Sequence, residues 1–146
     1  MTTIRFSCDV AVIDATDKPL TVTPVVNNRQ VSSVCIKDST TINVDIQNID
    51  DAEYTLNLII SGKENSHTKI DNNGNIISST ELMFSNFKFD DISIDSIVQL
   101  NSLSYTHNFN GTSKTITEKF YNTAGCNGTI EFKFTTPIHI WLLENM

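Results

Sequence analysis

The sequence is poor in the residues that build phosphate sites and long helices. Glycine occurs only five times in 146 residues, and none stands in a G-x-G-x-x-G or Walker arrangement, so a nucleotide-binding loop is excluded. Alanine occurs four times, whereas isoleucine and threonine each occur eighteen times. Because β-branched residues favour strands and alanine favours helices, this composition predicts an all-β protein.

Basic residues are also scarce. Ten Lys and Arg stand against seventeen Asp and Glu, which gives a net charge of −7 and a pI near 4.7. Binding to phosphate groups needs clustered positive charge, so we expect neither nucleic acid nor a membrane surface as a partner. No apolar run is long enough for a membrane-spanning helix, and the first residues show no signal-peptide pattern.

The three cysteines are Cys8, Cys35 and Cys126. They have no C-x-x-C spacing and no neighbouring histidines, so neither a disulfide framework nor a zinc site is expected. We expect all three to be reduced, with Cys8 in the core. The two Asn-Gly-Thr triplets, at 110–112 and 127–129, are predicted to be turns.

Apolar residues alternate with polar ones along several short runs. The clearest alternation covers 4–12, and similar runs at 42–47 and 54–60 are predicted to pair as neighbouring strands. Residues 67–77 predict a hairpin closed by Asn73-Gly74 in a type I′ turn. The apolar phase changes near Asn86, which predicts a bulge or a bend.

Such a series of short strands with polar turns predicts one domain over residues 1–146, folded as a two-sheet antiparallel β-sandwich of jelly-roll type. The predicted core consists of inward-facing apolar residues: Ile4, Phe6, Val10, Val44, Ile46, Leu56, Leu58, Phe84, Ile130, Phe132 and Phe134.

The C-terminal segment from Ile138 to Leu143 is rich in apolar residues and is predicted to be a strand. If Ile138, Ile140 and Leu142 face the core, Trp141 points outward as a ligand platform or subunit contact. A strand that is buried on both faces is the alternative.

Recognisable catalytic motifs are missing. The sequence has no G-x-S-x-G elbow and no His-Glu-x-x-His pattern. Asp90 and Asp91 are candidate calcium ligands, with a turn between two strands as the alternative, and Asp71, Asn73 and Asn75 lack the closing Glu of a calcium loop. No other cofactor is expected.

Aromatic rings, amides and hydroxyls cluster in the last third of the chain, in SYTHNFNGT, KFY, AGCNGT, FTTP and WLLENM. This combination suits a neutral sugar, because sugar rings stack on aromatic faces and their hydroxyls bond to amides. The alternative is that the rings are core and the Asn residues form turns.

The same strings resemble small jelly-roll proteins of tailed bacteriophages, which are themselves similar to carbohydrate-binding modules, over about residues 54–146. The resemblance implies a virion component that is made in the host cytoplasm without a signal peptide. The matching positions are candidate ligand contacts: Tyr105, His107, Asn108, Asn110, Tyr121 and Trp141.

We therefore expect a non-enzymatic virion component or binding module whose partners are virion proteins, further copies of itself or a carbohydrate. One alternative is a purely structural capsid or tail protein that oligomerises through edge strands and through residues 138–146. The other is a glycan hydrolase, for which two carboxylates are needed across a cleft. Its candidate residues are Asp90, Asp95, Glu118 and Glu131.

Overall fold

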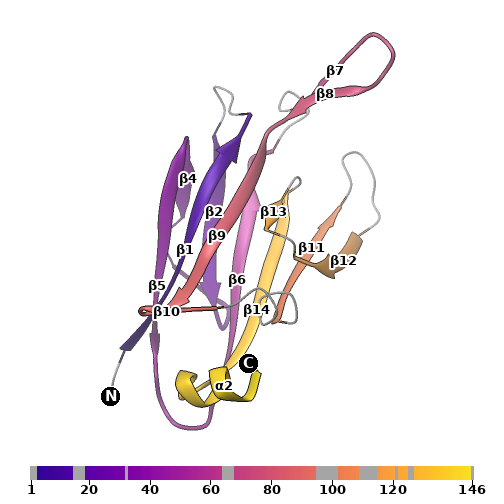
Figure 1. The fold of residues 1–146 in the computed structure, drawn as a ribbon. Coiled ribbons are helices and arrows are strands. Elements are labelled where there is room, and N and C mark those ends of the chain that lie inside the picture. Colours follow the sequence, from indigo (N-terminus) through magenta and orange to yellow (C-terminus); the bar gives the residue numbers. More distant parts are fainter. Residues whose placement is uncertain are drawn as a thin grey trace.

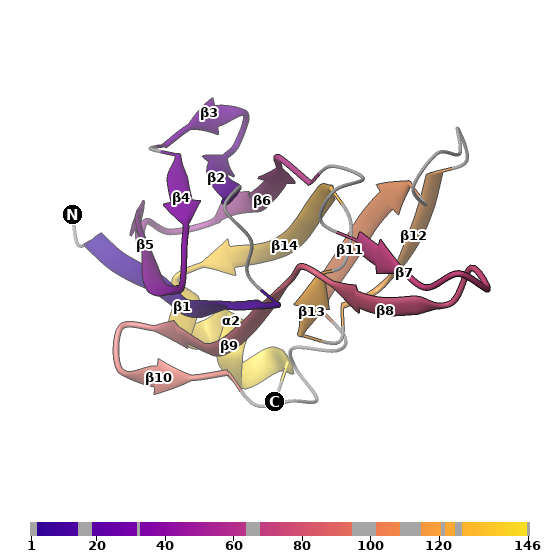
Figure 2. The same ribbon diagram turned by 90° about the horizontal axis from the view of Figure 1, so that it is seen from above.

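The computed structural model describes residues 3–14, 19–31, 33–63, 68–94, 102–108, 115–120, 122–124 and 127–145. Two antiparallel sheets pack against each other, a short helix lies at one end, and a separate hairpin projects from the other end (Figure 1). Seen from above, β1 (Thr3–Ile13) and β9 (Glu81–Phe89) lie in one layer, and β6 (Ala52–Ser61) and β14 (Gly128–Thr136) lie in the other (Figure 2). The predicted all-β sandwich is confirmed.

The sheet that contains the N-terminal strand, called sheet A below, has the order β10-β9-β1-β5, with β13 also paired to β9. Its strands are β1 (Thr3–Ile13), β5 (Ser39–Gln47), β9 (Glu81–Phe89), β10 (Ile92–Ser93) and β13 (Thr123–Ala124).

The second sheet, sheet B, has the order β12-β11-β14-β6-β2-β3, with β4 also paired to β2. Its strands are β2 (Leu20–Val26), β3 (Arg29–Gln30), β4 (Val34–Ile36), β6 (Ala52–Ser61), β11 (Leu103–Asn108), β12 (Thr115–Lys119) and β14 (Gly128–Thr136).

Successive strands of seven or more residues alternate between the sheets, in the order β1, β2, β5, β6, β9 and β14. The chain therefore crosses from sheet to sheet at the ends of the sandwich, as the connections of a jelly roll do. Every residue of the predicted core is buried. Phe6 of sheet A links the layers, because its ring lies 5.9 Å from Phe132 of sheet B and 5.4 Å from Phe89 of its own sheet.

The predicted pairing of residues 42–47 with 54–60 is wrong. β5 pairs with β1, whereas β6 pairs with β14 and β2 in the other sheet. Both strands have one apolar face, and these faces point into the core from opposite sheets instead of lying side by side in one sheet. Tyr54, near the start of β6, is bonded to the end of β5, because its hydroxyl donates to the Gln47 carbonyl at 2.9 Å.

The predicted irregularity near Asn86 is confirmed as a β-bulge. The register against β1 shifts between Ser7 and Asp9, and Asn86 has a positive φ of 53°. This extra residue lets Phe84 and Phe87 both point into the core although they are three residues apart.

The predicted hairpin, which follows β6 and precedes β9 in the chain, is confirmed as β7 (Thr68–Ile70) and β8 (Ile76–Ser79). Its predicted type I′ turn is wrong. The Gly74 amide donates to the Asp71 carbonyl at 3.1 Å, and only Gly74, with φ of 83°, has positive φ in this turn. The arrangement is a type I turn followed by a left-handed glycine.

The C-terminal segment is a helix, α2 (Ile138–Asn145), so the predicted strand is wrong. Its buried residues are Ile138, Trp141 and Leu142, which share one helical face, while Leu143 is 76% exposed. Pro137 precedes the helix and contributes its carbonyl to the first turn, where it accepts from the Ile140 amide at 3.1 Å. A helix buries residues three and four positions apart along one side, and Ile138, Trp141 and Leu142 have this spacing. The segment therefore suits a helix although its apolar residues do not alternate as in a half-buried strand.

Candidate functional site

Two of the predicted ligand residues point into the sandwich. Tyr105 and His107 lie on β11 and are 4% and 7% exposed. Their rings stack with centroids 4.4 Å apart, and Tyr105 also meets Phe120 edge to face at 5.9 Å. Gly128 allows this close packing, because a Cβ at that position would clash with the Thr106 carbonyl oxygen and approach the Tyr105 ring. Neither ring offers a face for sugar stacking.

A polar contact lies beside this ring pair at the sheet edge. His107 Nε2 is 3.1 Å from Glu118 Oε1, and the Glu118 side chain is 54% exposed. Glu118 is the cross-strand partner of Tyr105, so both side chains lie on the inward face of sheet B. The Glu118 carboxylate on the edge strand β12 thus lies at the border between the core and the solvent.

Trp141 is core rather than an exposed platform. It is 7% exposed, and its ring meets Phe132 at 5.5 Å and Phe134 at 6.4 Å. The expectation of an outward indole is wrong because it assumed the phase of a strand. Of the other predicted contacts, Asn110 and Tyr121 lie outside the described residues, and for Asn108 only the backbone is described. The described part of the set forms no common surface.

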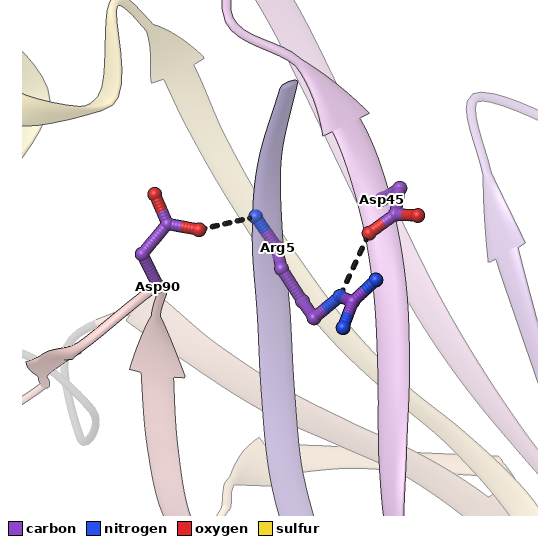
Figure 3. Close-up of polar contacts among 3 residues, drawn as sticks. All are labelled: Arg5, Asp45 and Asp90. Atoms are coloured by element: carbon purple, nitrogen blue, oxygen red, sulfur yellow. Dashed lines mark hydrogen bonds and ion pairs between the residues drawn. The ribbon is translucent and has the colours of Figure 1, made fainter. Parts of the chain in front are cut away.

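Asp90 and Asp91 form the turn between β9 and β10, and Asp90 has a positive φ of 51°. Asp90 Oδ1 accepts from the Arg5 amide at 2.9 Å, and the Asp90 amide donates back to the Arg5 carbonyl at 2.7 Å. The Arg5 guanidinium turns the other way, toward Asp45 on β5, with Nε 2.9 Å from Oδ1 (Figure 3). The hydrogen bond to Asp45 raises the pKa of Arg5.

These groups line a shallow depression with Thr3. The Asp90 carboxylate bonds to the Arg5 amide, and the Asp45 carboxylate bonds to the Arg5 guanidinium. Asp90 and Asp91 therefore form a turn between two strands, which was the alternative to a calcium site. Asp71 has a similar structural role, because its carboxylate accepts from the Asn73 and Asn75 amides, each at 2.9 Å, and these bonds lower its pKa. Within the described ranges, no three His, Cys, Asp or Glu side chains are placed to hold a metal ion.

The carboxylates considered for hydrolysis do not converge. Glu118 faces inward toward His107, whereas Glu131 lies opposite Ser104 on the outward face and is 3.5 Å from Lys133 Nζ. The two side chains therefore lie on opposite faces of sheet B. Asp90 lies in the turn between β9 and β10, two strands of sheet A, and Asp95 lies outside the described residues.

The cysteines divide between the core and the surface. Cys8 is buried, and burial raises the pKa of its thiol to about 12. Cys35 is exposed on β4, and neither residue is in a disulfide. Cys126 lies outside the described residues.

A group of exposed apolar side chains on the β7–β8 hairpin was not predicted from the sequence. Ile70, Ile76 and Ile77 of the β7–β8 hairpin are 61%, 68% and 68% exposed. Ile70 pairs with Ile76, and Ile77 is an extra residue in β8, because the register shifts between the Lys69–Ser78 and Ile70–Ile76 pairs. The adjacent pair Ile76-Ile77 in a short hairpin was the available signal, because a two-stranded hairpin by itself has no core in which to bury them.

A comparison with protein-family models, curated proteins and solved structures found no match. Of the described helices, none has the length and apolar character needed to cross a membrane.

Proposed function

We propose that this chain is a non-enzymatic assembly module that binds protein partners through the β7–β8 hairpin. In line with the sequence resemblance, we place it in a phage virion, with neighbouring virion proteins as the partners.

The exposed hairpin is the observation that carries the proposal. Its two strands pair only with each other among the described strands, and it projects beyond the sandwich (Figure 1). A two-stranded hairpin in water is at best marginally stable. Removing an exposed isoleucine from water contributes about 1.5–3 kcal/mol when burial is complete, so a partner that covers the three side chains stabilises the hairpin. We therefore expect the hairpin to become more stable when a partner protein binds to it.

The chemistry of this surface favours a protein over a sugar. In the part of the chain that the structure describes, every aromatic ring is buried except that of Tyr54, which is partly buried and uses its hydroxyl to bond Gln47. Sugar recognition combines exposed rings with polar partners. Isoleucine side chains have no polar atoms to satisfy sugar hydroxyls, whereas neighbouring exposed aliphatic side chains, such as the Ile70–Ile76 pair, are typical of protein contacts.

The hairpin is tested by replacing Ile76 and Ile77 with Thr in the chain supplied during virion assembly. Threonine keeps the β-branched shape and strand preference but removes apolar surface. We expect the amount of chain in purified virions, measured by mass spectrometry, to fall by about tenfold or more. The circular dichroism spectrum should not change.

Ile59→Thr is the matched control. Ile59 is 38% exposed, but it lies on β6 in the middle of sheet B. This variant should enter virions like the wild type. Absence of the wild-type chain from virions, or equal incorporation of the hairpin variant and the wild type, contradicts the proposal.

A further inference from the structure

Strand β5 ends sheet A, and among the described strands it pairs only with β1. Its nine residues pair with β1 in an unbroken register from Ser39 to Gln47. Among the described strands of seven or more residues, β5 alone has a single neighbour. Alternate residues of such a strand direct their amide and carbonyl groups outward, where they can pair with another chain.

The other edges of sheets A and B are protected in ways that β5 is not. β10 and β13 have two residues each, β3 and β4 are similarly short, and β12 carries Glu118 and Lys119. Short length, charge, proline and bulges are the usual devices that prevent edge pairing. β5, with the sequence STTINVDIQ, has no proline, no lysine and no register shift. It is a long, regular edge.

The one charged residue on β5 is Asp45, and it is compensated. Arg5 Nε on the neighbouring strand lies 2.9 Å from its carboxylate (Figure 3). The chain as a whole carries a net charge of −7, which opposes self-association elsewhere on the surface. At this edge the ion pair removes the local charge that would repel a second copy.

The sequence of β5 is compatible with its own reverse. Its midpoint is Asn43, and pairing about a two-fold axis at that residue places Ile42 opposite Val44 of the second copy and Thr41 opposite Asp45 of the second copy. Ile42, Val44 and Ile46 are buried and stay on the core face, so the two cores remain aligned. The two Asp45 side chains do not meet.

We propose that β5 pairs antiparallel with β5 of a second copy about a two-fold axis at Asn43, which joins two copies of sheet A into one continuous sheet. This contact uses a different surface from the hairpin and does not depend on it. Its closed two-fold symmetry predicts a dimer and not a filament.

The test uses charge at the axis. Asn43 is exposed, so Asn43→Lys and Asn43→Asp should leave the monomer folded. Each places like charges opposite one another in the dimer, and we expect dissociation constants at least about tenfold larger than for wild type. Mixing the two variants brings Lys opposite Asp and should restore a dimer. Light scattering during size exclusion gives the masses, against 16.3 kDa for one chain.

Ser85→Lys is the control, because Ser85 is exposed on β9 and adds the same charge to sheet A away from its edge. It should dimerise like the wild type. A wild-type protein that stays monomeric at millimolar concentration, or a dimer that Asn43→Lys leaves intact, overturns the inference. A mixture that stays monomeric overturns the register at Asn43. None of these results bears on the hairpin variants.

Discussion

The guanidinium of Arg5 lies 2.9 Å from the carboxylate of Asp45, joining the inner strand β1 to the edge strand β5. Both side chains are 58% exposed, so the pair contributes little to folding but controls the charge of the edge. We therefore expect the ion pair to affect the proposed dimerisation more than the stability of the fold.

Arg5→Ala leaves Asp45 uncompensated at the proposed dimer edge. We expect the dissociation constant of the dimer to rise about threefold at low ionic strength, and the effect to shrink at high salt because the charge is screened. Adding Asp45→Asn to this variant should restore wild-type affinity. Sedimentation equilibrium measures the constants, and identical affinity for Arg5→Ala and wild type at low salt would contradict this role for the ion pair.

Asp9 makes stability depend on pH in the acid range. Its carboxylate accepts hydrogen bonds from Asn86 and Thr41, each at 2.7 Å, and these lower its pKa below 3.8. Because the folded pKa is depressed, the stabilisation is present above the unfolded pKa and is lost as pH falls through the folded value. Asp9→Asn should therefore lose less stability than wild type when urea midpoints are compared at neutral and acid pH. An equal loss of stability for Asp9→Asn and for the wild type would contradict this role of Asp9.

Cys8 should be inert to thiol reagents in the folded chain. It is buried with a pKa raised to about 12, whereas Cys35 is exposed. In a Cys126→Ser background, titration with a thiol reagent at neutral pH should modify Cys35 alone, and unfolding in urea should release Cys8 as well. Modification of Cys8 at the rate of Cys35 in the native protein would show that its burial is wrong.

Trp141 should contribute to stability as a core residue. Trp141→Ala removes contacts with Phe132 and Phe134 and is expected to cost about 3–5 kcal/mol in the free energy of unfolding. Leu143→Ala, on the exposed side of the same helix, should change it by less than about 0.5 kcal/mol. Urea denaturation measures both, and equal small effects would place the indole outside the core.

The sequence predicts the strands where one face is apolar and the other is polar. Phe6, Val44 and Phe132 lie in such runs, and all are buried. Periodicity does not predict which sheet a strand joins. The predicted pairing of residues 42–47 with 54–60 is wrong for this reason. The same limit applies to 138–143, where apolar residues without a clear period fit a strand or a helix, and only packing against β14 decides between them.

The candidate site was less predictable, because residue type alone does not distinguish a core ring from a binding ring. Tyr105 and Trp141 have the chemistry of a sugar platform but fill the sandwich. Ile70 and Ile77 have the chemistry of a core but lie on a projecting hairpin. Exposure depends on the tertiary arrangement, which local pattern does not contain.

Photo-crosslinking from the hairpin tests the central claim most directly. A photoreactive amino acid replaces Ile77 in one variant and Ile59 in another, and assembled virions are irradiated and analysed by mass spectrometry. We predict that position 77 crosslinks to a neighbouring virion protein and that position 59 gives no such product. Assembled virions that contain the chain but give no protein crosslink at position 77 would contradict a function based on contacts made by this hairpin.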